Sequence, residues 1–532
     1  MVSADSGDTL LEGSWHDCAH NPLRLACFPF RPERTIFVAT PFALPAILTT
    51  LKPTFRLAIA FSLGQKYIAF VVQLLVAVIL ARLLTPQETG VFSLAAAAVS
   101  IGHLLREFGI SDYIISQKDA SLEKLRAAFT VTVLFAWGIA ALLWVCAEPM
   151  AAFYREPGVA QVMRLLCLNF LLLPFGSMAF AMLSKNLQFG RIFGVQTSAT
   201  IVSAVVTVWL AWAGYSYMSL AIGSVVSNVL SISLLLWLQQ GNVFLRPTTQ
   251  GLGAVLRFGG SVTVTRIIEQ LSYRSNDFIV SGSLGFHASG LLSKSNSLIG
   301  SFHEFFSSAV VRVATPAFAK AEQEDGDSRQ RYFQATVLVA TAQWIFFPVL
   351  GIFANEIIGI LFGANWLECV PVVQVAAVGA MIWAPFMLST ALLTARGAVT
   401  EQLRIQLVYA PLLIAAIFVG SWYSLMMIAI LGNLTIPVRL YLIDRVMTAR
   451  CNIRFRETMA HMGPSMLVAT VGIAVGLLSR WALVQASAPA FVTLIAGSAA
   501  LVLASLAAAA ALHHPVYGEA RRIVYKLVHR AG

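Results

Sequence analysis

Residues 57–80 read LAIAFSLGQKYIAFVVQLLVAVIL, and Lys66 is the one charged residue in this run. A helix needs about 20 apolar residues to cross ~30 Å of hydrocarbon. Apolar segments of this length recur along nearly the whole chain. The sequence therefore predicts an all-α polytopic membrane protein rather than a globular enzyme.

About fourteen transmembrane helices are predicted in this way. Their ranges are 57–80, 89–109, 126–147, 162–184, 192–213, 217–238, 258–283, 287–312, 333–354, 370–393, 403–422, 424–446, 459–482 and 489–512.

The composition agrees with a chain whose main solvent is lipid. Of 532 residues, 58% are hydrophobic and 11% are charged, whereas soluble domains are about 25% charged. The net charge of +11 would favour nucleic-acid binding in a soluble protein. Here most Lys and Arg residues lie in short loops, so we expect no nucleic-acid partner.

The loops between the predicted spans alternate in charge. With the N-terminus in the cytoplasm, 22 Lys and Arg residues fall on the cytoplasmic side, Arg439 and Arg445 among them, and 3 fall on the outer side. Cytoplasmic loops of membrane proteins carry this excess of positive charge. We therefore expect a bacterial inner-membrane protein with both termini in the cytoplasm.

The spans group into two halves. We expect a disordered cytoplasmic tail at 1–54, a six-helix bundle at 55–240, a linker at 241–256, a second six-helix bundle at 257–450, and two extra helices with a basic cytoplasmic tail at 451–532. An upstream assignment of the start codon is the alternative explanation of the tail at 1–54.

A shift of 200 residues brings the two halves into weak register. It pairs Gly90 with Gly290, Ser93 with Ser293, His103 with His303, Leu84 with Leu284, and Lys66 with Arg266. Six spans return the chain to the same side of the membrane, so these matches predict a parallel repeat. Transporters built from repeats commonly bind substrate between them.

Ionisable residues inside the predicted spans are the candidate site residues, because each costs roughly 2.5–3.5 kcal/mol near the centre of a membrane helix. Residues 258–283 contain Arg266, Glu269, Arg274 and Asp277, which fall within an arc of about 140° on a helix. Such a stripe must face a cavity or other helices. Alternatively, Arg266 with Glu269 and Arg274 with Asp277 are i,i+3 ion pairs that merely hold helices together.

Three further spans carry polar residues. Lys66 and Gln73 share one face of the first span, His103 lies near the end of the second, and Lys294 lies in the eighth. Lys66 and Lys294 have no obvious partner on their own helices. We expect these spans to line a central chamber of net positive charge.

Motifs of catalysis do not occur in the sequence. There is no G-x-x-x-x-G-K-[ST], no H-E-x-x-H and no nucleophile elbow, and the six cysteines show no paired spacing. We expect a protein that is not an enzyme and that needs no metal or cofactor.

Several stretches resemble the Wzx-type polysaccharide flippases of the multidrug/oligosaccharidyl-lipid/polysaccharide exporter superfamily. They are LARLLTPQETGVFSLA (80–95), REFGISDYIISQKD (106–119), SNDFIVSGSLGFHASGLLSKSNSL (275–298), VRVATPAFAK (311–320) and LFGANWLECVPVVQ (361–374). The third places Asp277 on the acidic position of the family pattern, with Leu292 in place of the usual tyrosine. The likeness covers roughly residues 55–450.

This resemblance implies a flippase that moves oligosaccharide repeat units on undecaprenyl pyrophosphate to the periplasmic leaflet by alternating access, for synthesis of exopolysaccharide, capsule or O-antigen. Lys66, Arg266, Arg274 and Lys294 would bind the diphosphate. Glu269, Asp277, Gln73 and His103 would tune these charges or carry a coupling ion. A polysaccharide polymerase and co-polymerase would be partners in the membrane. The alternatives are a cation-coupled multidrug antiporter of the same superfamily and a lipid-precursor flippase for cell-wall synthesis.

Overall fold

The computed structural model describes residues 53–107, 122–186, 188–238, 252–324, 328–518 and 521, and all regular elements in these ranges are helices. Helices suit lipid because every backbone N–H and C=O group inside a helix is satisfied within its own segment. Residues 1–52 of the predicted tail at 1–54, most of the linker at 241–256 and residues 522–532 lie outside the described ranges.

The first half of the chain contains six long helices. They are α2 (Pro53–Leu83), α3 (Pro86–Glu107), α5 (Leu122–Tyr154), α6 (Pro157–Lys185), α7 (Phe189–Trp212) and α8 (Met218–Leu238).

The remaining helices follow the linker. They are α9 (Leu252–Ser283), α10 (Gly285–Glu324), α11 (Ser328–Ile352), α12 (Ala354–Leu361), η1 (Ala364–Cys369), α13 (Val370–Trp383), η2 (Ala384–Phe386), α14 (Ser389–Ala395), α15 (Val399–Ser421), α16 (Leu425–Leu434), α17 (Ile436–Cys451), α18 (Phe455–Gln485) and α19 (Ala490–Ala511).

Two predicted spans are interrupted in the structure. Span 370–393 consists of α13, η2 and α14, and span 424–446 consists of α16 and α17. A proline lies at each break, Pro385 in η2 and Pro437 in the first turn of α17, and proline cannot donate the backbone hydrogen bond that a continuous helix needs. The short elements α12 and η1 were not predicted.

Within the described residues, eleven segments are long and apolar enough to cross a membrane. The all-helical polytopic fold is therefore confirmed. Helices α3, α9 and α10 are not among the eleven, and the count of fourteen stays a prediction.

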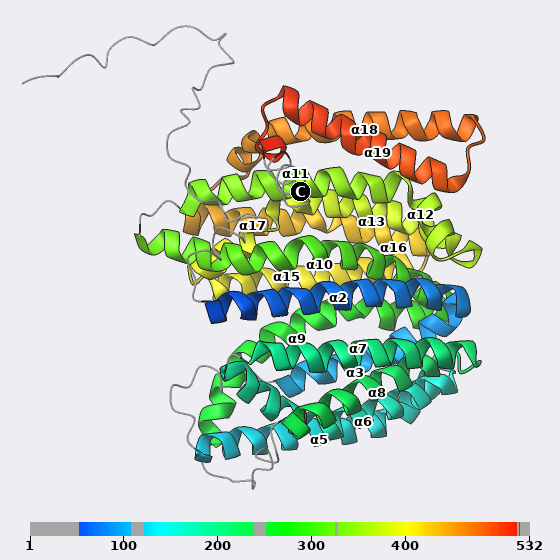
Figure 1. Cartoon of the computed structure of the whole chain (residues 1–532), viewed down its shortest axis with the longest axis vertical. Coiled ribbons are helices and arrows are strands. Elements are labelled where there is room, and N and C mark those ends of the chain that lie inside the picture. The colour runs from blue at the N-terminus through cyan, green and yellow to red at the C-terminus, as the bar shows by residue number, and fades with distance from the viewer. Residues whose placement is uncertain are drawn as a thin grey trace, which may run out of the picture. The chain divides into compact units, whose positions relative to one another are not determined.

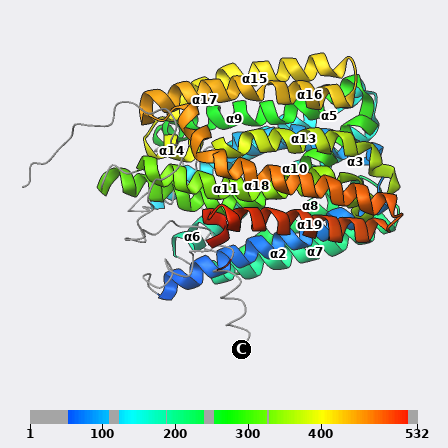
Figure 2. The same cartoon turned by 90° about the horizontal axis from the view of Figure 1, so that it is seen from above.

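Helix α3 packs against many neighbours, namely α5, α6, α8, α9 and α10. Helix α2 lies beside α7, and the pair α18–α19 lies against α11, as Figure 1 and Figure 2 show. All these helices belong to one compact unit, Val38–Gly532. The division into two six-helix bundles stays a prediction. The end of the bundle where α2 passes into α3 is called the predicted outer end below, because the charge pattern assigns it to the outer side.

Candidate functional site

Helices α3 and α10 cross at the predicted outer end with their backbones in contact. A Cβ atom on Gly90 would overlap the carbonyl oxygen of Phe286, and one on Gly290 would overlap the carbonyl oxygen of Pro86. Glycine is needed at both positions because backbones can approach this closely only where no side chain intervenes.

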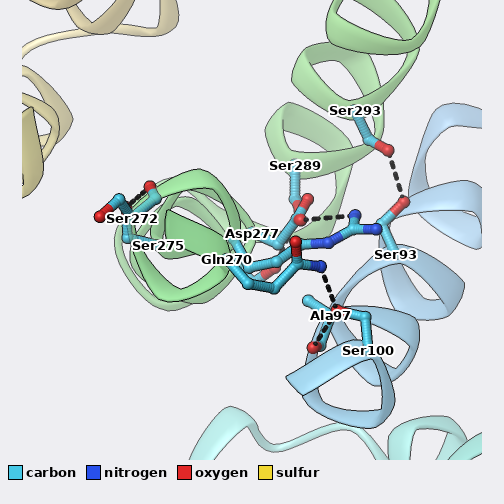
Figure 3. A network of polar contacts seen from close by, with 11 residues as sticks. Ser93, Ala97, Ser100, Gln270, Ser272, Ser275, Asp277, Ser289 and Ser293 are labelled. Atoms are coloured by element: carbon cyan, nitrogen blue, oxygen red, sulfur yellow. Dashed lines mark hydrogen bonds and ion pairs between the residues drawn. The ribbon is translucent and has the colours of Figure 1, made fainter. Parts of the chain in front are cut away.

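The same crossing pairs residues that the 200-residue shift made equivalent. Gly90 meets Gly290, and the Oγ atoms of Ser93 and Ser293 form a hydrogen bond of 2.7 Å (Figure 3). Contacts between equivalent positions arise when two elements are related by a two-fold axis. The crossing therefore has the geometry of a two-fold contact between α3 and α10.

A cavity of about 440 Å³ lies beside this crossing, between α2, α3, α7, α8 and α10. Its lining is rich in hydroxyl groups. The polar side chains that line it are Gln73, Thr89, Ser93, Thr200, Ser203, Thr207, Ser224, Ser227, Ser293, Lys294 and Ser297. Lys294 is the one charged residue among them, and the described lining contains no carboxylate.

Lys294 reaches from α10 to α2. Its Nζ atom donates a hydrogen bond of 2.9 Å to the carbonyl oxygen of Ala77. It also lies 4.3 Å from the centroid of the Phe362 ring and 5.2 Å from that of Trp366. Within the described residues no carboxylate forms an ion pair with it. Its charge is thus stabilised by one carbonyl dipole and by two aromatic faces, both weaker partners than an anion.

Two further side-chain bonds to backbone carbonyls join α2 to the segment α12–η1. The indole Nε1 of Trp366 donates to the carbonyl of Ala81 at 2.7 Å, and Arg82 donates to the carbonyl of Ile360 at 2.5 Å. Together with the bond from Lys294, they form what we call the α2 clip. The α2 clip fastens α2 to residues that lie 217 to 285 positions later in the chain.

The polar stripe of α9 meets α3 and α10. Arg274 Nη1 lies 3.5 Å from Asp277 Oδ2, and Asp277 is buried. Gln270 donates to Ser100 of α3 at 3.1 Å (Figure 3). The i,i+3 ion pair that the sequence offered as an alternative is therefore present for Arg274 and Asp277. The side chain of Arg266 lies outside the described part of the structure.

The other predicted site residues lie at different places in the structure. Gln73 lines the cavity with Lys294. His103 stacks on Phe170 with 4.5 Å between ring centroids, and neither is among the residues that line the cavity. Lys66 forms a loose pair with Glu304, 3.8 Å apart, with 40% and 66% of the two side chains exposed. Glu269 is exposed and interacts electrostatically with Arg439.

Arg439 was predicted from the sequence to lie in a cytoplasmic loop, and this prediction is wrong. It was counted with a cytoplasmic loop, but it lies in α17 within the membrane-spanning segment Leu425–Cys451. Its guanidinium group lies 4.0 Å from the ring centroid of Trp383 and 5.0 Å from that of Tyr409. The predicted span 424–446 already contained Arg439, so its position within that span was the signal that could have identified it.

Comparisons with known proteins agree with this architecture. A family model described as "polysaccharide biosynthesis protein" matches residues 79–371, which is more than half of the chain. Lipopolysaccharide biosynthesis protein WzxC of Escherichia coli (strain K12) is 22% identical over 347 residues, covering 64% of this chain and 70% of WzxC. Succinoglycan biosynthesis transport protein ExoT of Rhizobium meliloti (strain 1021) is 25% identical over 311 residues, covering 58% of this chain and 62% of ExoT.

A solved structure shares the fold. The lipid II flippase MurJ in an inward closed conformation superposes with a TM-score of 0.66 at 13% identity, covering 86% of this chain and 99% of MurJ. The match to the family model and to these relatives confirms the resemblance that the sequence motifs indicated. The chain is a multi-pass membrane protein and belongs to the polysaccharide biosynthesis protein family.

Proposed function

We propose that this protein is a flippase of the bacterial inner membrane. It transfers an oligosaccharide repeat unit on undecaprenyl pyrophosphate from the cytoplasmic to the periplasmic leaflet, with both of its own termini in the cytoplasm. The relatives support this proposal, because ExoT is named a transport protein and WzxC a lipopolysaccharide biosynthesis protein. The observation that carries it is Lys294, a cation in a hydroxyl-lined cavity without a paired carboxylate.

The chemistry of this cavity suits a phosphorylated saccharide. A diphosphate is anionic and cannot cross hydrocarbon bare, and lysine is a common phosphate ligand that acts as a point charge. Serine and threonine hydroxyls both donate and accept hydrogen bonds, as sugar hydroxyls do. A volume of about 440 Å³ lies within the range of about 300–1,000 Å³ of small-molecule sites. The polyprenyl chain stays in the lipid.

A cation substrate fits this cavity less well. An antiporter for cationic drugs needs acidic side chains to attract its substrate, whereas the described lining contributes Lys294 and no carboxylate. The buried acidic residue Asp277 of α9 could attract a cation, but it is paired with Arg274.

The α2 clip suggests how binding is coupled to movement. A phosphate oxygen is a stronger acceptor than the neutral carbonyl of Ala77, because its negative charge also attracts the ammonium group of Lys294. Phosphate that captures Lys294 therefore removes one of the three bonds that fasten α2 to α10 and α12–η1. Loss of that bond favours separation of the helices at the predicted outer end and release of the saccharide there.

The remaining candidates keep subordinate roles in this proposal. Lys66 and Arg266 attract the diphosphate at the predicted cytoplasmic side, where the Lys66–Glu304 pair is open to solvent. Arg274 contributes to the positive field while paired with Asp277. Glu269, Gln73 and His103 tune the field or carry a coupling ion. A polymerase and a co-polymerase would receive the product.

The first test replaces Lys294 with alanine in cells that depend on this protein for polymer export. We expect export to fall by about 10- to 100-fold, the effect of losing one hydrogen bond to a charged group, while the protein reaches the membrane at its normal level. Lys320→Ala is the matched control, since Lys320 is an exposed lysine of the same helix.

A second variant separates substrate binding from the α2 clip. Trp366→Phe keeps an aromatic ring beside Lys294 but removes the indole N–H that bonds Ala81. We expect this variant to lose less export than Lys294→Ala, because Lys294 remains available to the phosphate. Normal export by Lys294→Ala, with protein levels matched by immunoblot, would refute the assignment of Lys294.

A further inference from the structure

Arg439 occupies a position that a purely structural role explains poorly. It comes from α17 and extends between Trp383, the last residue of α13, and Tyr409 of α15. A guanidinium group inside a membrane span is costly because it loses the hydration of its charge. Two cation–π contacts offset this cost without supplying an anion. Among the described residues, no carboxylate lies within ion-pair distance of Arg439.

The aromatic rings leave part of the binding edge of the guanidinium group available, since Tyr409 accepts one side-chain hydrogen bond from Arg439. Rings attract a guanidinium through its flat face, whereas its five N–H donors lie in its plane and point outward. A planar fork of donors matches the two oxygens of a carboxylate or phosphate. The arrangement holds the group in place and orients it without neutralising its charge.

The surroundings of Arg439 connect it to the predicted chamber. Glu269 of α9 interacts electrostatically with Arg439. The imidazole ring of His303 in α10 interacts electrostatically with both Glu304 and Arg439. Glu304 in turn pairs loosely with Lys66 of α2. These charged residues thus connect α2, α9, α10 and α17, which are far apart in the sequence. Arg439 is not among the residues that line the Lys294 cavity.

We propose that Arg439, held over Trp383 and Tyr409, is a second anion-binding residue and takes an oxyanion of the transported saccharide-lipid. This inference rests on the proposed flippase function. The oxyanion has two possible sources, namely the diphosphate of the lipid or the carboxylate of an acidic sugar in the repeat unit. A cation at each of two separate places permits the substrate to be held at one while it leaves the other.

The test measures binding to the purified full-length protein in detergent. The probes are undecaprenyl diphosphate, an undecaprenyl-diphosphate disaccharide that ends in glucuronic acid, and the same disaccharide ending in glucose. The variant is Arg439→Gln. The matched control is Arg445→Gln, because Arg445 lies on the same helix beside a tyrosine ring but is exposed.

We expect Arg439→Gln to weaken binding by about 10- to 100-fold, the loss of one charge-assisted hydrogen bond, and Arg445→Gln to leave it unchanged. Equal weakening for all three probes identifies the diphosphate as the ligand. Weakening confined to the glucuronic acid probe identifies an acidic sugar. Unchanged binding of all three overturns the proposal.

A measurement on the unmodified protein guards against a variant that does not fold. Phenylglyoxal reacts with accessible arginines, and mass spectrometry gives the extent of reaction at each. We expect whichever probe binds Arg439 to reduce its labelling at least threefold while Arg445 reacts as before. Equal labelling of Arg439 with and without every probe contradicts the inference. The flippase proposal itself fails separately, if the unmodified protein reconstituted in vesicles does not translocate any of these lipids.

Discussion

At the scale of single residues, the absence of a side chain matters as much as its presence. Gly90 and Gly290 let two backbones touch, and Lys294 places a cation beside that contact. The 200-residue shift identified both glycines from sequence because their spacing matches the repeat. It could not identify the partners of Lys294, since Phe362 and Trp366 approach it only through the tertiary fold.

The glycine contact gives a prediction about stability. In Gly290→Ala, the added methyl group overlaps the carbonyl oxygen of Pro86, so α3 and α10 must move apart. Overpacking of this kind costs about 1–3 kcal/mol. We expect a lower thermal unfolding midpoint, measured by tryptophan fluorescence in detergent, and reduced export.

Gly463→Ala serves as its control. A methyl group at Gly463 in α18 has no atom within 4 Å, and alanine favours helix over glycine by about 1 kcal/mol. We expect this variant to be at least as stable as the original protein. A Gly290→Ala protein as stable as the original would show that α3 and α10 move apart without loss of stability.

At the scale of elements, the sequence predicted where helices lie more reliably than where they break. Apolar length was enough to locate the eleven described segments that can cross a membrane, because it follows from membrane thickness alone. The breaks at η2 and between α16 and α17 depend on Pro385 and Pro437, and membrane helices tolerate proline when neighbours satisfy the freed backbone groups. The aromatic neighbours of Arg439 could not be predicted either, because Trp383 and Tyr409 approach it only through the tertiary fold.

The crossing of α3 and α10 can be locked chemically. The Oγ atoms of Ser93 and Ser293 are 2.7 Å apart, so the Sγ atoms of cysteines at these positions start close enough together to form a disulfide. In a background with the native cysteines replaced, we expect Ser93→Cys with Ser293→Cys to form the bond on oxidation and to abolish translocation in vesicles. Reductant should restore activity.

Each single cysteine variant provides the comparison for this experiment. Neither can form the bond, so both should translocate lipid under oxidising and reducing conditions alike. Full activity of the oxidised double variant would mean that α3 and α10 do not separate during transport.

At the scale of the whole molecule, the C-terminal pair α18–α19 is attached to the rest through buried polar contacts. Ser465 of α18 bonds Thr341 of α11 at 2.7 Å and His514 at 3.0 Å. The Nδ1 atom of His514 accepts a hydrogen bond of 3.3 Å from the backbone N–H of Val516. Arg480 of α18 also bonds Glu356 of α12 at 3.0 Å. The predicted domain boundary at 451 thus falls before elements that contact both α11 and the α12–η1 segment.

His514 makes the attachment of this pair sensitive to pH. It follows the end of α19, and burial lowers its pKa below the usual 6.5. The unfolded protein then binds more protons than the folded one, so the contribution of His514 to stability is complete above pH 6.5 and decreases as pH falls through the lowered pKa. We expect the unfolding midpoint to drop between pH 7.5 and about pH 5, and His514→Gln to reduce this dependence.

His513→Gln is the neighbouring control, because it also removes one imidazole group while His513 is exposed. An identical pH dependence in the original protein and in His514→Gln would assign the effect to other groups.

The α2 clip has an evolutionary consequence. Its acceptors at Ala77, Ala81 and Ile360 are backbone carbonyls, which every amino acid supplies, whereas its donors are the particular side chains of Lys294, Trp366 and Arg82. The acceptor positions should therefore tolerate more substitutions than the donor positions. In a saturation library selected for export, we expect many small apolar residues at the three acceptor positions and few replacements at the three donors. Homologues could then vary at the acceptor positions while they keep the same donor residues.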